Sequence, residues 1–357
     1  MKTASLLFPA WPRQFLSLAT VAAASAAQPE FAWVQKPDRL AITHAGRPVA
    51  DYVFQDAAIL RPHFRNLHAP SGRQVTRNHP PAPGEPADHA TMHPGLWLAF
   101  GDINGQDFWR NKARVEHVAF SSQPALTNGR LIFATQNRLL AVDGSTLATQ
   151  LSRFTVARTG DAAFLLTWAT EIRSGSRELV FGDQEEMGLG VRVATELTEK
   201  NGGLVVTSDG IRGAKQAWGK PAAWAAYSRE LAGRLWGAAI FPAQSNPTPT
   251  WWHSRDYGVV VANGFGQRVL PAAAAGKLVV PAGGALSLRY GILLFDTPAA
   301  RPIEARPSRR TRAISAPGRR SSRFAGRRTT AMRTSGPRRS RGQPSPSWSA
   351  RSRPPGR

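Results

Sequence analysis

Two stretches in the middle of the chain decide the class of fold: RLIFATQNRLLAVDGSTLATQLSRFTVAR at residues 130–158 and AAFLLTWATEI at residues 162–172. Both are rich in Leu, Val, Phe and Thr, and β-branched and aromatic residues favour the pleated surface of a β-sheet. An Asp143-Gly144 pair interrupts the first stretch, and this dipeptide is a common hairpin turn. The two stretches therefore predict short strands that are separated by turns.

The same pattern continues on both sides of these stretches. Further strand-like runs are GVRVATEL at 190–197, GGLVVTSDG at 202–210, GVVVANGFG at 258–266 and GKLVVPAGGALSLRYGILLF at 276–295. Further turn dipeptides are Asn128-Gly129, Asn201-Gly202, Asp209-Gly210 and Asn263-Gly264. Segments with a helical period are scarce, although residues 215–235 fit either a helical turn or strands. Strands at this spacing without helices between them indicate an all-β fold. We predict one large two-sheet antiparallel β-sandwich over residues 28–298, with a mutarotase-like sandwich as one form of it.

The N-terminal residues differ in composition from this central part. Lys2 and Arg13 precede or flank the apolar run FLSLATVAAASAA, which ends in small residues. Positive charge, an apolar run and a small-residue cleavage site are typical of an export signal. We predict a signal peptide over residues 1–27 and a periplasmic or secreted protein. An uncleaved N-terminal helix or membrane anchor is the alternative.

The C-terminal residues 299–357 carry most of the formal net charge of +23. From Arg301 onward there are 17 Arg, no Lys and one acid, Glu304, which leaves a charge of only +7 for the first 300 residues. The tail has few large aliphatic residues, so we predict that it is disordered. Arg without Lys is also the composition expected when a GC-rich gene is read in a wrong frame. A genuine disordered tail and an arm for nucleic acid or anionic surfaces are the other interpretations.

Composition and missing motifs exclude several classes of protein. The chain has no cysteine, which excludes disulfides and thiolate metal sites. No stretch after the predicted signal reaches the ~18 apolar residues of a membrane span. The sequence contains no GxSxG, P-loop or dinucleotide fingerprint. Because the central part is only mildly basic, we predict no specific nucleic-acid partner.

The longest irregular stretch, TRNHPPAPGEPADHATMHP at residues 76–94, contains five prolines and is predicted to be a loop. Five of the eight histidines lie close together in the sequence: His63, His68, His79, His89 and His93. Imidazole serves as an acid/base near neutral pH and as a metal ligand. We predict that His89 and His93 are catalytic acid/base residues, aimed at the open end of the sandwich by the Pro94-Gly95 step. One alternative is a divalent metal site with ligands among His63, His89, His93 and His253. Another is that the histidines only bond to the loop backbone.

Two further motifs supply a carboxylate and candidate substrate contacts. Glu185 and Glu186 are adjacent, so on an extended chain they point to opposite faces, and we predict Glu186 as the carboxylate partner of a catalytic histidine. A solvated acidic turn is the alternative. The motif WWHSRDYG at 251–258 combines aromatic and polar residues that suit a hydroxyl-rich ligand. The predicted substrate-binding residues are Trp252, His253, Arg255, Trp218 and Lys220. A tryptophan strand in the core is the other interpretation.

Taken together, five blocks resemble the PmoA-like family of bacterial proteins over residues 59–296. The blocks are RPHFRNLHAPSGRQVTRNHPP, DHATMHPGLWLAFGDINGQDFWRNKARVEH, EEMGLGVRVATEL, AWGKPAAW and WWHSRDYGVVVANGFG. The resemblance implies an exported all-β domain of poorly defined activity, of a kind seen beside sugar-degrading proteins. Gly264 and Ala214 depart from the Pro and Glu that this family tends to have there, and Ala214 removes any acid role at its position.

Three functions are consistent with these observations. The first is a carbohydrate-active enzyme that uses His/carboxylate acid-base chemistry on a sugar or sugar derivative. The second is a metal-dependent, His-ligated oxygenase or hydrolase, with Asp88 or Glu186 as a carboxylate ligand. The third is a non-catalytic carbohydrate-binding module that uses tryptophans alone. The sequence does not identify the cofactor, and the expected partner is a carbohydrate or another small molecule.

Overall fold

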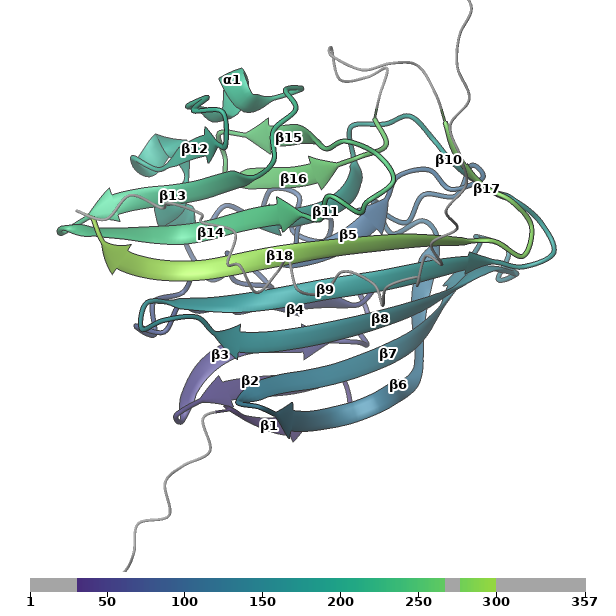
Figure 1. Cartoon of the computed structure of the whole chain (residues 1–357), viewed down its shortest axis with the longest axis horizontal. Coiled ribbons are helices and arrows are strands. Elements are labelled where there is room, and N and C mark those ends of the chain that lie inside the picture. The colour runs from purple at the N-terminus through teal and green to yellow at the C-terminus, as the bar shows by residue number, and fades with distance from the viewer. Residues whose placement is uncertain (1–30, 267–276, 300–357) are drawn as a thin grey trace, which may run out of the picture. The chain divides into compact units, whose positions relative to one another are not determined.

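Two eight-stranded antiparallel sheets face each other in the computed structural model (Figure 1). The model describes residues 31–266 and 277–299. The predicted all-β, two-sheet antiparallel sandwich is therefore confirmed in this part of the chain. The predicted signal peptide at 1–27 and all but the first residue of the predicted tail at 299–357 lie outside the described residues.

The first sheet has the strand order β1-β2-β3-β4-β5-β11-β16-β15. Its strands are β1 (Phe31–Gln35), β2 (Arg39–His44), β3 (Arg47–Val53), β4 (His63–Arg65), β5 (Leu96–Phe100), β11 (Met187–Arg192), β16 (Val259–Asn263) and β15 (Trp251–Arg255). The central strands β4, β5, β11 and β16 come from distant parts of the sequence, so this sheet depends on long-range pairing.

The second sheet has the strand order β12-β13-β14-β18-β9-β8-β7-β6. Its strands are β12 (Leu204–Thr207), β13 (Ala225–Leu231), β14 (Arg234–Pro242), β18 (Ala285–Pro298), β9 (Ala163–Ser174), β8 (Thr146–Arg158), β7 (Arg130–Leu140) and β6 (Arg114–Thr127). A separate pair consists of β10 (Leu179–Phe181) and β17 (Leu278–Val280), and the helical segments are η1 (Thr195–Leu197), η2 (Glu199–Asn201) and α1 (Ala214–Ala217). Residues 215–235 thus contain both a helical turn and a strand.

Turn chemistry in the sequence defines the hairpins of the second sheet. Asn128 and Gly129 join β6 to β7, with φ values of 50° and 69°. Positive φ at both central residues is the type I′ turn that matches the twist of paired strands. Asp143-Gly144 lies in the connection between β7 and β8, as the sequence predicts.

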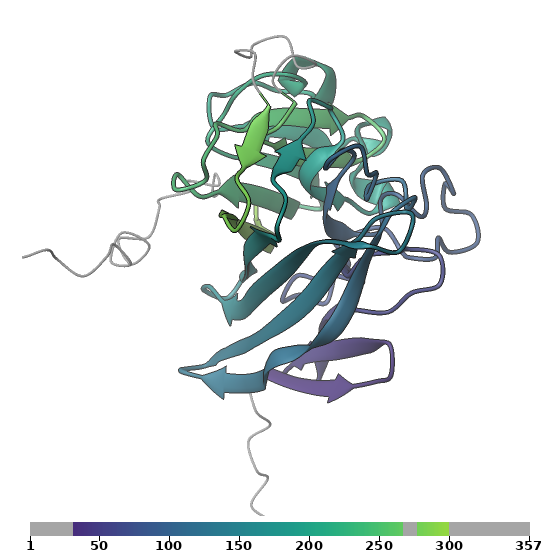
Figure 2. The ribbon, with the colours of Figure 1, turned by 90° about the vertical axis from the view of Figure 1, so that its right-hand side faces the viewer.

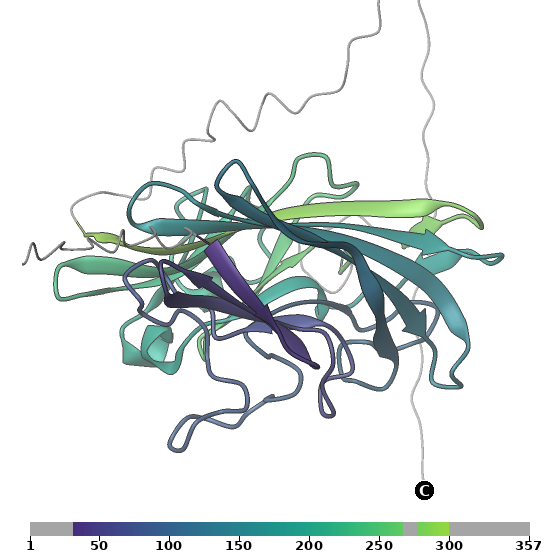
Figure 3. The same cartoon turned by 90° about the horizontal axis from the view of Figure 1, so that it is seen from below.

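Aromatic side chains from both sheets fill the space between them. Tyr52 of the first sheet lies 4.9 Å from Phe154 and 5.4 Å from Phe133 of the second, between ring centroids. Its hydroxyl also forms a 3.3 Å hydrogen bond with the Thr135 hydroxyl. Edge-on views show the two layers (Figures 2 and 3). In the described part of the chain, no helix has the length and apolar character needed to cross a membrane.

The central strands of the first sheet are buried on both faces, unlike β8 and β9 of the second sheet. Every residue of β5, β11 and β16 is buried, whereas β8 and β9 alternate between buried and more exposed residues. The long connection between β4 and β5 lies on the side of the first sheet that faces away from the second (Figure 3). This covered outer face is where the predicted site residues gather.

Candidate functional site on the outer face of the first sheet

A row of five residues crosses the outer face of the first sheet. The strand register pairs His63 with Trp97, Trp97 with Gly190, Gly190 with Val261, and Val261 with His253. Successive side chains of a strand point to opposite faces. The sequence neighbours of these residues belong to the core between the sheets, namely Phe64, Leu96, Leu98, Leu189, Val191, Val260, Ala262 and Trp252. The row therefore presents its side chains to the loops that cover the sheet.

Gly190 makes room for the indole of Trp97. A Cβ atom added at Gly190 would lie 2.5 Å from Cζ2 and 2.7 Å from Cε2 of Trp97, closer than real Cβ contacts allow. The absence of a side chain lets the Trp97 ring lie across β11. The same ring is fully buried and packs with Trp109, Val259 and Val261 in a small apolar cluster. A glycine in the middle of an apolar strand thus shapes the floor of the site.

Substituting Gly190→Ala should displace Trp97 and lower the free energy of unfolding by about 1–3 kcal/mol, the usual cost of overpacking. Urea unfolding followed by tryptophan fluorescence measures this loss. Gly175→Ala is the matched control, because its added Cβ would meet no heavy atom within 4 Å. We expect the control to stay within about 0.5 kcal/mol of the wild type. Equal effects in the two variants would show that the Trp97 contact does not matter.

Imidazole and aromatic rings form a stack above this floor. The His93 ring lies 5.0 Å from Trp97 at an interplanar angle of 17°, and the His89 ring lies 5.2 Å from His93. Tyr257 extends the stack at 5.6 Å from His89. The His93 N–H donates to the His89 carbonyl at 2.9 Å, so the two histidines close a single hydrogen-bonded turn before Pro94.

The expectation that His89 and His93 point to the open end of the sandwich is wrong. They lie over the outer face of the first sheet, because the chain enters the central strand β5 directly after Pro94-Gly95. The Arg192 N–H donates to the Gly95 carbonyl at 2.7 Å, which joins this entry to the neighbouring strand β11.

A buried pair of arginines holds the loop that carries the two histidines. Arg192 donates to both carboxylate oxygens of Asp88, at 3.0 and 3.1 Å. Arg77 donates to the carbonyls of Pro86 and Asp88 at 3.0 and 2.8 Å. Burial raises the pKa of Asp88, but the hydrogen bonds and charge of Arg192 outweigh it and hold this pKa below its ordinary value. Asp88 thus anchors the loop to β11.

His93 combines deep burial with unused hydrogen-bonding capacity. Its exposed fraction is 2%, and neither ring nitrogen has a hydrogen-bond partner among the described residues. Burial lowers the pKa of His93 to about 2, and the positive charges of His89, Arg192 and His253 act in the same direction. The ring is therefore neutral at physiological pH, with one N–H donor and one acceptor nitrogen. Buried polar groups without partners are rare and call for an explanation, such as a ligand.

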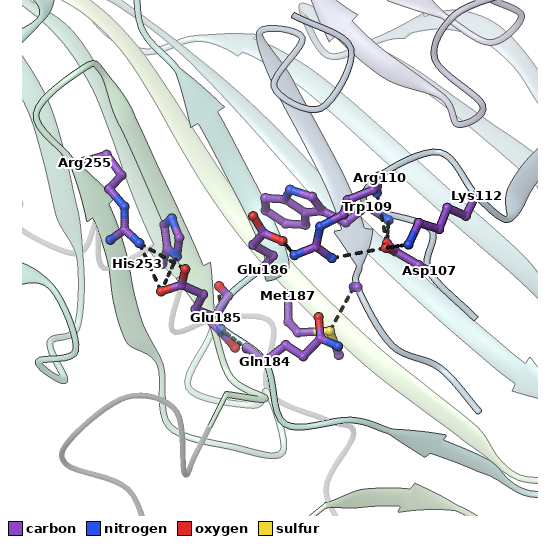
Figure 4. Close-up of polar contacts among 12 residues, drawn as sticks. Asp107, Trp109, Arg110, Lys112, Gln184, Glu185, Glu186, Met187, His253 and Arg255 are labelled. Atoms are coloured by element: carbon purple, nitrogen blue, oxygen red, sulfur yellow. Dashed lines mark hydrogen bonds and ion pairs between the residues drawn. The ribbon is translucent and has the colours of Figure 1, made fainter. Parts of the chain in front are cut away.

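A carboxylate lies beside the second imidazole of the site (Figure 4). Nδ1 of His253 is 3.8 Å from Oε2 of Glu185, just beyond hydrogen-bond distance. Arg255 donates to both oxygens of Glu185 at 3.0 Å. Burial lowers the pKa of His253 to about 4. The positive charge of Arg255 also lowers this pKa, whereas the negative charge of Glu185 raises it. This arrangement can orient a neutral imidazole and stabilise it if it gains a proton.

Glu186 occupies a different environment from the predicted one. Its carboxylate forms an ion pair with Arg110, which also donates to Asp107 at 3.1 Å (Figure 4). The carboxylate beside a histidine is therefore Glu185, and the sequence-based choice of Glu186 was wrong by one residue. Trp109 and Arg110 had no predicted role. The one sequence feature that could have indicated them is the aromatic and basic segment FWRNKAR at residues 108–114, downstream of the histidine loop.

The predicted substrate-binding residues divide into three groups. His253 and Arg255 share the outer face of β15, as the alternation predicts, and the Arg255 guanidinium lies 5.8 Å from the Trp218 ring. Trp252 points to the opposite face, is fully buried in the core and donates to the Ala222 carbonyl, so its predicted role as a substrate contact is wrong. Lys220 is exposed. Its backbone carbonyl accepts a hydrogen bond from the backbone N–H of Trp252, and its side-chain amine does not join the site.

The predicted ligand set His63, His89, His93 and His253 does not form one metal site. His63 stands at one end of the cross-strand row and His253 at the other. Within residues 31–266 and 277–299, the one group of three side chains with suitable ligand atoms is Asp56, His63 and His79, whose atoms lie within 4.8 Å of one another. Only His63 of the four candidates belongs to it.

A hollow of about 530 Å³ lies next to Trp252, which donates to the carbonyl of the lining residue Ala222. Its lining consists of Asp209, Pro221, Ala222, Ala223, Pro242, Ala243, Gln244, Asn246, Pro247, Thr248, Pro249 and Thr250. Asp209 is the single titratable group in this lining. It therefore offers little acid-base chemistry, and the outer face of the first sheet remains the better candidate site.

Comparison with known proteins gives a family and no assigned activity. Among solved structures, the chain is similar to an α-galactosidase from Lactobacillus brevis, with 7% sequence identity and a TM-score of 0.38. That similarity covers 75% of this chain and 39% of the α-galactosidase, so the chain spans well under half of that protein. None of the curated proteins matches this chain.

The resemblance to the PmoA-like family is wrong. The family model that matches, over residues 39–306, is described as a family of unknown function, DUF6807. This match covers about three quarters of the sequence, and the chain belongs to the family of unknown function DUF6807.

Proposed function

We propose that this chain is an exported carbohydrate-active enzyme that moves protons on a sugar or sugar derivative at the outer face of the first sheet. The observation that carries the proposal is His93, a buried and neutral imidazole with both nitrogens unpartnered among the described residues. Hydroxyl groups of a ligand would satisfy both nitrogens, since a hydroxyl donates and accepts hydrogen bonds. The periplasmic or secreted location is part of this proposal.

The surroundings of His93 suit a hydroxyl-rich ring. Trp109 lies 5.8 Å from His93 at an interplanar angle of 80° but is fully buried, so the half-buried Trp218 beside Arg255 is the aromatic ring that a ligand could reach. Aromatic faces accept the apolar face of a sugar, while charged groups bond to its hydroxyls. Glu185 and Arg255 are each about one third exposed, so the ligand can approach them from solvent.

The His253–Glu185 pair would carry the proton. In the proposed reaction, the His253 imidazole takes the proton from the anomeric hydroxyl of a cyclic sugar as the bond from the anomeric carbon to the ring oxygen breaks. A carbonyl forms at that carbon, and the ring oxygen becomes an alkoxide. The imidazolium returns its proton to this oxygen, and re-closure of the ring gives either anomer.

His93 and Glu185 have supporting roles in this step. The N–H of His93 would donate a hydrogen bond to the ring oxygen as negative charge develops there. Glu185 would shorten its 3.8 Å separation from His253 Nδ1 and stabilise the imidazolium. Arg255 holds Glu185 in place through hydrogen bonds to both carboxylate oxygens.

The test is the rate of anomer interconversion for a panel of aldoses, each dissolved as a pure anomer and followed by polarimetry with the full chain. We expect acceleration for at least one sugar, and a 10²- to 10⁴-fold loss in His253→Gln and Glu185→Gln, the usual range for acid-base residues. His117→Gln, on the second sheet, should keep the full rate. Tryptophan fluorescence reports binding in parallel.

The outcomes separate the candidate functions. Binding of a sugar without acceleration of any proton transfer would favour a non-catalytic carbohydrate-binding module. Neither binding nor acceleration across the panel would contradict the proposal. Full activity in both site variants would place the reaction elsewhere on the chain.

A further inference from the structure

We infer that Asp56, His63 and His79 form a binding site for one divalent transition-metal ion, separate from the proposed sugar site. Asp56 follows β3, His63 begins β4 and His79 lies in the long loop between β4 and β5. Three separate segments of the chain therefore bring two imidazoles and one carboxylate together. Each offers a ligand atom, and these atoms lie within 4.8 Å of one another.

His63 is oriented as metal-binding histidines are. Its Nδ1 lies 3.2 Å from the Arg61 carbonyl, so Nδ1 carries the proton and Nε2 keeps its lone pair. The side chain is fully buried, and Nε2 has no hydrogen-bond partner among the described residues. A hydrogen bond from one ring nitrogen to a carbonyl fixes the tautomer and the ring orientation in metal sites. The unused Nε2 is the observation, independent of the grouping, that points to a ligand.

Asp56 presents one free oxygen to the same point. Its Oδ1 accepts from the N–H groups of Ala58 and Ile59 at 2.7 and 3.0 Å. Its Oδ2 lies 3.8 Å from Nε2 of His79. Two ligands at ~2.1 Å from a tetrahedral ion stand ~3.4 Å apart, so a shift of a few tenths of an ångström suffices. The His79 and His63 rings meet edge to face, with their centroids 5.7 Å apart.

The charges of the surroundings permit a cation. Arg61, Arg65 and Arg77 add positive charge near the two imidazoles. Arg65 lies 3.5 Å from the Asp51 carboxylate and Arg77 lies 3.5 Å from the Asp88 carboxylate, so carboxylates offset two of these charges. Arg61 donates to the carbonyls of Trp109 and Met92. The side chain of Asp56 is 17% exposed, which provides a route for an ion from solvent. Two neutral imidazoles and one carboxylate leave one coordination position for water and suit zinc or iron(II).

The ion would join the loop that carries His89 and His93 to the edge of the site. His79 belongs to this loop, and His63 lies next to Trp97 in the cross-strand row. Binding would therefore restrain the loop from a second side, opposite the Asp88–Arg192 pair.

Cobalt(II) added to chelator-treated full-length protein is the test. We expect one Co²⁺ per chain with the visible absorption of a tetrahedral or five-coordinate site, displaced by Zn²⁺. Asp56→Asn and His79→Gln should each weaken Zn²⁺ binding by more than the 10- to 100-fold that loss of a supporting hydrogen bond causes. His117→Gln, which removes a half-buried imidazole on the second sheet, should bind like the wild type.

Two results would overturn the inference: no stoichiometric Co²⁺ or Zn²⁺ in folded wild-type protein, or equal affinity in the wild type and both ligand variants. A measurement on the wild type alone guards against misfolded variants. Paramagnetic Co²⁺ should shift or broaden the ring-proton resonances of His63 and His79 and leave those of His117 sharp. Loss of metal binding with retained anomer interconversion would separate this site from the proposed sugar site.

Discussion

The free energy of unfolding should fall by about 4 kcal/mol as the pH drops from 5.5 to 4.5 in the presence of a chelator. Burial lowers the pKa of His63 to about 3, of His93 to about 2 and of His253 to about 4. The unfolded chain protonates all three near their ordinary value of about 6.5. Each proton taken up only by the unfolded state lowers stability by about 1.4 kcal/mol per pH unit.

The direction of this effect follows from which state binds more protons. Well above pH 6.5 both states hold neutral imidazoles, and stability does not change with pH through these residues. Between about pH 6 and the folded pKa values only the unfolded state is protonated, so acid favours unfolding. Urea unfolding at pH 7.5, 6.5, 5.5 and 4.5 measures the slope. A stability that stays flat between pH 5.5 and 4.5 would contradict the burial of neutral histidines.

Substituting His93→Leu should stabilise the fold while abolishing sugar binding and proton transfer. The variant removes two buried nitrogens that have no partner among the described residues, and one such group costs about 1–3 kcal/mol. Loss of the ring stack with Trp97 offsets about 0.5–1.5 kcal/mol of this gain. We expect a net gain of about 1–2 kcal/mol at pH 7.5. The gain should be about 2 kcal/mol larger at pH 5, because one acid-sensitive imidazole is gone.

His117→Leu is the matched control for this prediction. Nδ1 of His117 lies 3.3 Å from the Asn137 side-chain oxygen, so its loss leaves a buried amide without that partner. We expect the control to be less stable than the wild type and to keep sugar binding. Thermal unfolding at both pH values, with fluorescence titration of the sugar that binds, covers both variants. Destabilisation by His93→Leu at both pH values would show that the ring supports the fold rather than a ligand.

The candidate site could be predicted only in part. The histidine loop, the shared strand face of His253 and Arg255, and the opposite directions of Glu185 and Glu186 followed from the loop prolines and from strand alternation. The choice of Glu186 failed because alternation distinguishes two faces without saying which side chain meets a histidine. The prediction that Trp252 contacts the substrate failed for a related reason. The adjacent residues Trp251 and Trp252 point to opposite faces of the strand, and the sequence does not mark which face belongs to the core.

The sequence by itself determined the class of fold and its turns. Runs such as residues 130–158 and the Asn128-Gly129 turn act over a few residues, so their physics is local and readable from the chain. Tertiary structure alone decided which distant residues meet. The row from His63 to His253 needs β4, β5, β11, β16 and β15 side by side. Asp56, His63 and His79 meet only because one loop folds back over that row. Strand order and loop closure depend on the packing of the whole sandwich, and no short stretch of sequence contains that information.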